Sequence, residues 1–173
     1  VGALAMGKGV RLAALVQGGG QEEGLRSGTE NTPGIAGFHA AIENYPAAHA
    51  MRALKLRLLE RLREGIPEVA VNGPDPAGPS ACGHILNLSF PPVRAQTMMH
   101  ALEGEGVIVS HGAACSSRRR SPSATLTGMG LPKVRQDSAL RFSLSPYTTE
   151  SEIDAAVSAC VSNYRNLKPY TRR

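Results

Sequence analysis

One cysteine in the C-terminal half of the chain has neighbours that suit nucleophilic chemistry. Cys115 lies in the run SHGAACSS, residues 110–117, whose small residues would leave a thiol accessible. Three arginines follow at 118–120, and positive charge favours the thiolate, which is the nucleophilic form of cysteine. His111 is a nearby proton acceptor in the sequence. The same pattern also fits a small buried core cysteine beside a solvated arginine run, so both interpretations stand at this point.

An arginine within an apolar strand is the second candidate. Arg141 alternates with Leu140 and Phe142 in the segment ALRFSL, residues 139–144, so its side chain is expected on the opposite face of the strand. An arginine in such surroundings needs an anionic partner, and a carboxylate held by two parallel hydrogen bonds is the usual one. A structural salt bridge within the protein would satisfy the same need.

A glycine-rich polar loop near the start is the third candidate. The segment GGGQEEGLRSGTEN, residues 18–31, leads into helical sequence. Gly28 and Thr29 could present backbone N–H groups and a hydroxyl to a phosphate. A simple loop ending in a helix N-cap is the alternative.

Composition narrows the class of protein. The 173 residues are 42% hydrophobic, enough for a core, and carry a net charge of +5. That charge lacks the aromatic platform of nucleic-acid binders, so direct nucleic-acid binding is not expected. No apolar run approaches the roughly 20 residues of a membrane span. The three cysteines include no C-x-x-C pair, which indicates a reduced, cytoplasmic protein without a disulfide framework or metal site.

The elements that position these candidates follow from periodicity. Strands are expected at 1–6, 11–16, 69–71, 84–90, 107–110 and 139–144. Helices are expected from 33, around 51–65, at 94–105, at 123–129 and from Thr149 to about 167, the last with Glu152 completing a capping box. The fold class is therefore α/β, in its α+β form, with helices on one side of a small sheet.

The sequence predicts two regions, of which only the second can form a domain with its own core. Residues 46–173 form a small α/β domain that carries the Cys115 loop. Residues 1–45 cannot bury a core alone, so they are expected to be the remnant of a larger domain, with exposed apolar surface. The absence of an initiator methionine fits a fragment.

Three segments in this order then carry a family resemblance: GGGQEEGLRSGTENTPGIAGF, VIVSHGAACSS and ALRFSLSPYTTESEID. The chain resembles the C-terminal portion of NifS/IscS-like cysteine desulfurases, which are class V, fold-type I pyridoxal-phosphate (PLP) enzymes. The resemblance implies that Cys115 takes the substrate sulfur as a persulfide and that Arg141 binds the carboxylate of L-cysteine. It further implies that Thr29 reaches the phosphate of the partner subunit's PLP, with Arg26 in the same loop.

The resemblance also implies a homodimer, alanine as product, and a protein that accepts the sulfur, either an iron–sulfur scaffold or a thiolation enzyme for tRNA or thiamin. The family's cofactor-bonding lysine would fall before Val1, so this chain alone is expected to be inactive. Two alternatives remain: a sulfur carrier without PLP that uses Cys115, or a regulatory remnant that binds an intact desulfurase.

Overall fold

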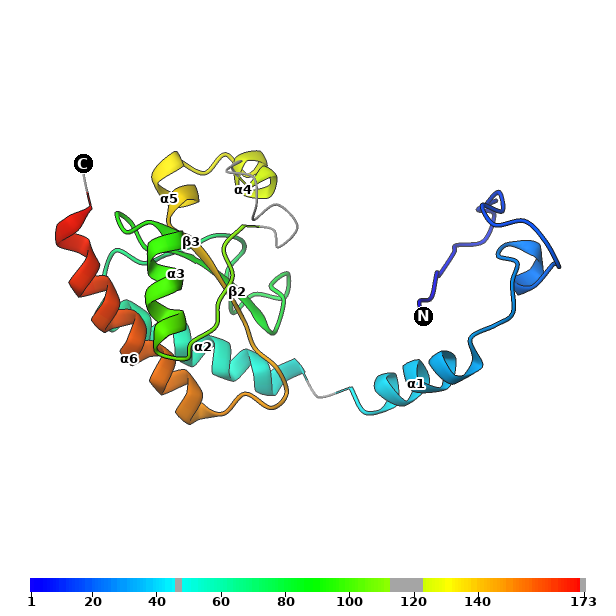
Figure 1. Cartoon of the computed structure of the whole chain (residues 1–173), viewed down its shortest axis with the longest axis horizontal. Coiled ribbons are helices and arrows are strands. Elements are labelled where there is room, and N and C mark those ends of the chain that lie inside the picture. Colours follow the sequence, from blue (N-terminus) through cyan, green and yellow to red (C-terminus); the bar gives the residue numbers. More distant parts are fainter. Residues whose placement is uncertain (46–47, 113–122, 172–173) are drawn as a thin grey trace. The chain divides into compact units, whose positions relative to one another are not determined.

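The structure, a computed structural model, describes residues 1–45, 48–112 and 123–171 (Figure 1). The chain divides into two compact units, Val1–Pro46 and Ala47–Arg173. Among the described residues, no helix combines the length and the apolar character that a membrane crossing requires.

The first unit contains little regular structure. It has a short 3-10 turn, Glu22–Gly24, and one helix, α1 (Thr32–Glu43), which Asn31 caps by accepting a hydrogen bond from the Gly34 amide at 3.0 Å. The strands expected at 1–6 and 11–16 do not form, and only Val16 makes an isolated bridge, to Arg26. A strand needs a neighbour to pair with its backbone, and the described part of this unit supplies none for these residues.

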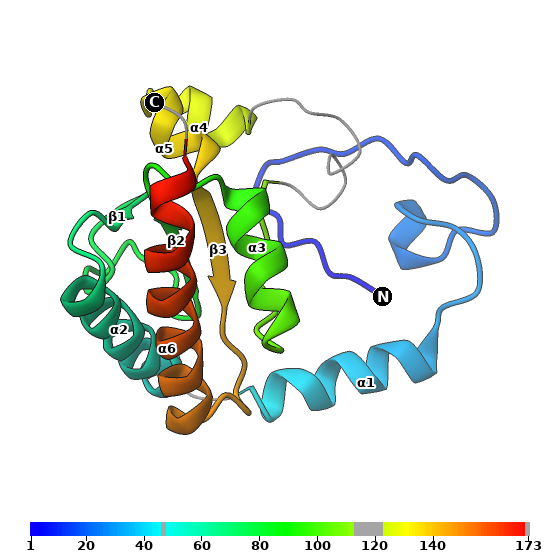
Figure 2. The same ribbon diagram turned by 60° about the vertical axis from the view of Figure 1, so that its left-hand side comes forward.

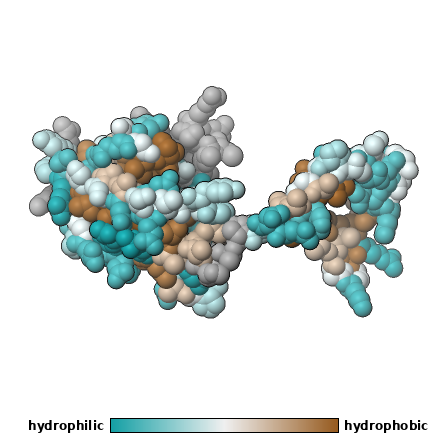
Figure 3. All heavy atoms as spheres, turned by 90° about the horizontal axis from the view of Figure 1, so that it is seen from below, coloured by the Kyte–Doolittle hydropathy of each residue, from teal (hydrophilic) through white to brown (hydrophobic). Residues whose placement is uncertain are grey.

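Apolar side chains of the first unit are exposed, as predicted. Ile35, Phe38 and Ile42, which recur at helical spacing on α1, keep 44%, 38% and 58% of their surface accessible, and Leu15 keeps 97%. Apolar atoms are visible on the surface of this unit in Figure 3. The unit therefore buries almost none of its own apolar surface.

The second unit is built on a three-stranded antiparallel sheet in the order β1-β2-β3. The strands are β1 (Ala70–Val71), β2 (Ile85–Ser89) and β3 (Ala139–Ser143). Leu86 and Leu88 of β2 pair with Phe142 and Leu140 of β3. Because side chains alternate along a strand, all four point to the same face, and that face is buried.

Three long helices cover this face (Figure 2). They are α2 (Ala48–Gly65), α3 (Ala95–Gly104) and α6 (Glu150–Leu167), and α6 contacts both of the others. Their apolar stripes complete the core, with Leu62, Met98 and Cys160 fully buried. The unit is completed by α4 (Ala124–Gly128), α5 (Lys133–Asp137) and a final 3-10 turn, Lys168–Tyr170.

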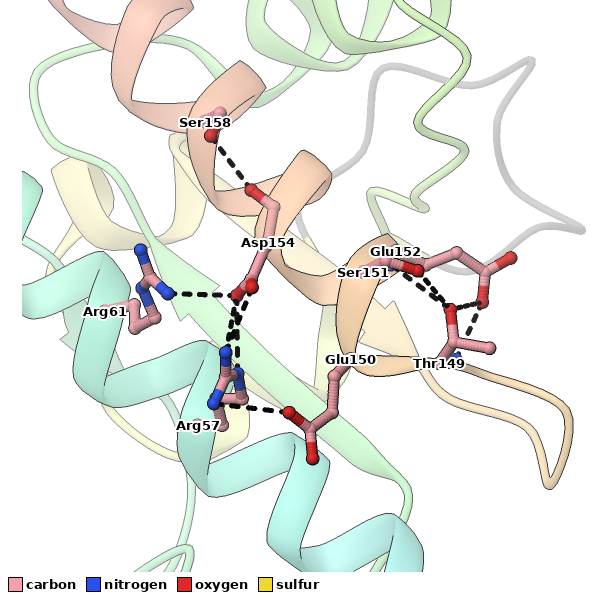
Figure 4. Close-up of polar contacts among 8 residues, drawn as sticks. All are labelled: Arg57, Arg61, Thr149, Glu150, Ser151, Glu152, Asp154 and Ser158. Carbon is pink, nitrogen blue, oxygen red and sulfur yellow. Dashed lines mark hydrogen bonds and ion pairs between the residues drawn. The ribbon is translucent and has the colours of Figure 1, made fainter.

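Polar contacts fix the start of α6 and its position on α2 (Figure 4). The predicted capping box is present: Thr149 Oγ1 accepts from the Glu152 amide, and a Glu152 carboxylate oxygen accepts from the Thr149 amide at 2.7 Å. One turn later, the Asp154 carboxylate receives hydrogen bonds from Arg57 and Arg61 of α2. The pKa of Asp154 is lowered, chiefly by the hydrogen bond from Arg57.

Residues 107–110 do not form the buried strand that the sequence predicts. The Val107 amide donates to Leu102 O at 2.9 Å and so helps to close the C-terminal end of α3, while Ile108 keeps 77% of its surface accessible. Only Ser110 reaches the edge of β3, where it forms one antiparallel bridge with Arg141. The remaining elements confirm the predicted α+β class, with α5 as an additional short helix.

Candidate functional site

Arg141 lies at the centre of β3 with backbone partners on both sides. It pairs with Asn87 of β2 on one side. On the other side its amide donates to Ser110 O at 2.7 Å, and its carbonyl accepts from the Ser110 amide at 3.1 Å. The two main-chain bonds to Ser110 on one side and the pairing of β3 with β2 on the other fix the direction in which the side chain leaves the strand. As predicted, Arg141 alternates with the buried Leu140 and Phe142 and so faces away from the core helices α2, α3 and α6.

The Arg141 guanidinium is a donor group that the described part of the protein does not satisfy. Its Nε is buried and makes no hydrogen bond, and no carboxylate among the described residues pairs with the side chain. A buried guanidinium N–H without an acceptor is costly. The arrangement suits a carboxylate or another planar anion brought by a ligand, which a guanidinium binds through two parallel bonds.

The bridge from Ser110 also brings the start of the cysteine loop to Arg141. Ser110 is followed by the half-buried His111 and by Gly112, whose φ of +63° lies in the left-handed region that favours glycine. Cys115 and the three arginines at 118–120 lie outside the described residues. What the structure places beside Arg141 is therefore the point from which the chain leaves toward Cys115.

Other polar side chains lie on the same face of the sheet as Arg141. Ser89, fully buried, donates to Arg135 O at 2.7 Å, and Asn72 Nδ2 donates to Asn87 Oδ1 at 2.8 Å. Arg135 Nη2 donates to Asn72 Oδ1 at 2.7 Å. This network occupies Arg135 in holding α5 against the sheet, whereas the neighbouring Arg141 takes no part in it. Arg135 is thus held on this face through its Nη2, although its Nε, like that of Arg141, is buried without a hydrogen bond.

In the first unit, the loop with Arg26 and Thr29 is ordered by its own polar contacts. Gln21 Oε1 accepts from the Gly28 amide at 3.0 Å, and Arg26 Nη1 donates to Ser27 O at 2.6 Å. Gly28 has a φ of +112°, a conformation that residues with a side chain rarely adopt, so glycine is strongly favoured there. The Gly28 amide is therefore engaged within the loop, which corrects the expectation that it would be presented to a phosphate.

Thr29 and Arg26 nevertheless remain accessible. Both are exposed, and the Thr29 hydroxyl makes no hydrogen bond with the residues that the structure describes. An exposed hydroxyl and a guanidinium in one ordered loop are chemically suited to a phosphate. These two residues belong to the first unit and Arg141 to the second, so the structure describes the two groups separately.

The residues present fit the cofactor that the resemblance implies at two points. The Thr29 loop offers groups for its phosphate, and Arg141 offers a fork for the carboxylate of an amino acid bound to it. The four lysines of the chain do not take the place of the family's cofactor-bonding lysine, which would fall before Val1. Lys55 Nζ donates to Cys82 O at 2.7 Å, and Lys8 is an exposed turn residue. Lys133 and Lys168 form ion pairs with Asp137 and Glu68.

Sequence reasoning found Arg141 but missed its neighbours. Neither Ser110 nor Asn87 stands out, because a serine at the end of an apolar run and an asparagine in an alternating strand are ordinary. Their importance comes from the register that pairs both with Arg141. Only pairing of the strand 84–90 with 139–144, worked out residue by residue, would have identified Asn87.

Comparison with known proteins identifies the family of the chain. Residues 5–156 match the aminotransferase class-V family. The chain is 41% identical over 169 residues to a cysteine desulfurase IscS of an Anaeromyxobacter species, covering 92% of this chain and 39% of that protein, and 38% identical over 159 residues to one of Clostridium botulinum, covering 89% and 40%.

A solved structure titled NifS-like protein superimposes with a TM-score of 0.71 at 31% identity, covering 93% of this chain and 40% of that one. The chain thus spans about two fifths of the length of these relatives. The match to the family extends across both units. The chain belongs to the aminotransferase class-V family.

Proposed function

We propose that this chain is the part of a PLP-dependent cysteine desulfurase that binds the substrate carboxylate and accepts its sulfur. The observation that carries the proposal is the Ser110–Arg141 bridge, because it joins the origin of the Cys115 loop to a guanidinium whose buried Nε has no acceptor among the described residues. Relatives 38–41% identical to the chain, named cysteine desulfurase IscS, support it.

In this proposal each residue has a distinct task. Arg141 binds the carboxylate of L-cysteine by two hydrogen bonds and orients the amino acid. The Cys115 thiolate attacks the substrate sulfur, which leaves the carbon of L-cysteine and becomes the outer sulfur of a Cys115 persulfide, while the substrate is released as L-alanine. The electron pair of the broken carbon–sulfur bond stays with the carbon, which takes up a proton to give alanine. The carbon is thereby reduced as the Cys115 thiol is oxidised to the persulfide, so the reaction needs no external oxidant or reductant.

The cofactor would be held in part by the first unit. Thr29, with Arg26 beside it, would donate to the phosphate of PLP bound by a partner subunit, so the enzyme would be a homodimer. When bound, PLP supplies the electron sink that weakens the bond between carbon and sulfur. The first unit would then belong to a large cofactor-binding domain, which would cover the apolar residues exposed on α1.

The persulfide would be passed to a second protein. A sulfur on a loop of small residues can be reached by an incoming thiol, and an iron–sulfur scaffold or a thiolation enzyme would be the acceptor, in the cytoplasm.

A chimera tests the proposal. The segment of the Anaeromyxobacter relative that matches this chain is replaced by the chain itself, and alanine release from L-cysteine is measured with PLP present. Cys115→Ser is compared with Cys82→Ser, a matched loss of an exposed thiol at another position. Gel filtration and the visible absorbance of bound cofactor show whether each protein is folded and loaded.

The proposal predicts alanine release by the chimera and by Cys82→Ser, and its loss in Cys115→Ser. A folded, PLP-loaded chimera that releases no alanine would contradict the desulfurase function. If that inactive chimera still took sulfur from an added persulfide, the results would favour a sulfur carrier. If it neither released alanine nor took up sulfur, they would favour a regulatory role.

A further inference from the structure

A second thiol of the chain lies in a loop that two cations of α2 hold in place. Arg52 donates to Ala77 O and Gly78 O, both at 3.1 Å, and to Ala81 O at 3.2 Å. One turn along the helix, Lys55 Nζ donates to Cys82 O at 2.7 Å. Lys55 is fully buried although it is a lysine. The backbone of residues 77–82 is thereby fixed to α2 up to and including Cys82.

The Cys82 side chain contacts the imidazole of His84. Its Sγ lies 3.3 Å from His84 Nδ1 and 3.9 Å from Nε2, so the sulfur lies over the imidazole ring, and a rotation of the exposed Cys82 side chain would bring the thiol into line with a ring nitrogen. Cys82 is exposed and His84 is half-buried, next to the start of β2. The thiol is therefore accessible while its proton acceptor is held by the sheet. Asp75, the acidic residue of the same loop, accepts a hydrogen bond from the Ala77 amide and so is turned toward its own backbone.

We propose that Cys82 and His84 form a reactive thiol–imidazole pair, separate from Cys115, that undergoes exchange with low-molecular-weight disulfides. His84 takes the thiol proton, and the sulfur attacks one sulfur of the disulfide. The negative charge that develops on Cys82 Sγ is near the ammonium of Lys55, which binds the carbonyl of the same residue and stabilises that charge.

The exchange balances without further reactants. A new bond forms between Cys82 Sγ and the attacked sulfur as the original sulfur–sulfur bond breaks. The leaving thiolate takes the proton from His84, so one thiol and one disulfide are consumed and one of each is produced. The product is a mixed disulfide on Cys82, which a second thiol can reverse.

Cys160 is a cysteine of the same unit whose thiol is expected to be unreactive. It is fully buried on α6, and burial raises its pKa to about 12. The two thiols differ in accessibility and in neighbours: Cys82 has an imidazole within 3.3 Å, whereas Cys160 packs in the apolar core.

The test is the rate at which oxidised glutathione modifies Cys82 in the full chain at neutral pH, followed by peptide mass so that each cysteine is measured separately. Two comparisons isolate the pair. The first is a synthetic peptide of residues 77–86, which has both side chains without the fold. The second is His84→Asn, with His100→Asn as the matched loss of an exposed imidazole that contacts Glu103 instead. Unmodified Cys160 confirms that each protein is folded.

We expect Cys82 in the folded chain to react faster than in the peptide. We also expect His84→Asn to slow it about tenfold, less than the roughly hundredfold or more of general-base catalysis in enclosed sites because this pair is partly solvated. His100→Asn should react like the parent chain. Equal rates in the folded chain and the peptide, or a folded His84→Asn variant that reacts as fast as the parent, would overturn the proposal.

Discussion

Substitution of Arg141 should weaken substrate use far more than it weakens the fold. In Arg141→Gln the two main-chain bonds to Ser110 and the pairing of β3 with β2 remain, because they involve only backbone atoms. The substitution removes the charged guanidinium and the two parallel hydrogen bonds that it can donate to a carboxylate. Each hydrogen bond to a charged group contributes about 1.5–3 kcal/mol, so losing two would cost roughly 3–6 kcal/mol, of which the glutamine amide restores a part.

A net loss of about 3 kcal/mol corresponds to roughly a hundredfold fall in kcat/KM. Arg141→Lys keeps the charge but not the two parallel bonds, so about a tenfold fall is expected. The assay is alanine release by the chimera across a range of L-cysteine concentrations. Arg63→Gln, which removes an exposed arginine of α2, is the control. If Arg141→Gln left kcat/KM unchanged in a folded protein, Arg141 would have no role in carboxylate binding.

Three further predictions concern the second unit. Leu62→Ala, at a fully buried position of α2, should lower the free energy of unfolding in urea by about 2–5 kcal/mol, whereas Arg63→Ala next to it should change it by less than about 0.5 kcal/mol; equal effects would contradict the described core. Thr149→Ala should cost about 1 kcal/mol by removing the cap of α6, seen as a lower urea midpoint, and an unchanged midpoint would show that the capping box does not stabilise the helix. Burial raises the pKa of Cys160 from 9.0 to about 12, so the folded state retains the thiol proton longer than the unfolded chain and stability should fall as pH rises from about 9 toward 12; Cys160→Ala should fall less over this range, and an equal fall would assign the loss to other groups.

The sequence predicts the second unit well because its patterns are local and strong. The stripe that includes Leu58 and Leu62 predicts α2, alternation predicts β2 and β3, and Thr149 with Glu152 predicts the start of α6. Each of these signals is completed within a few residues, and the packing of the unit reinforces it.

The predictions that failed depend on partners distant in sequence. Residues 1–6 and 11–16 have strand-like composition, but pairing needs a neighbouring strand, and composition does not supply one. Residues 107–110 read as a buried strand, yet the Val107 amide is used to close α3 and only Ser110 meets β3. The contact of Lys55 Nζ with Cys82 O could not be predicted, because Lys55 precedes Cys82 by 27 residues and reaches it only through the packing of α2.

The measurement that tests the account most directly is the fate of the substrate sulfur. The chimera is incubated with L-cysteine carrying a heavy sulfur isotope, and the peptide containing Cys115 is analysed by mass. The account predicts one labelled sulfur atom on Cys115, removable by a reducing thiol, and labelling of that peptide about a hundredfold slower in Arg141→Gln at low substrate concentration. Alanine formation without label on Cys115, or label that persists unchanged in Cys115→Ser, would contradict it.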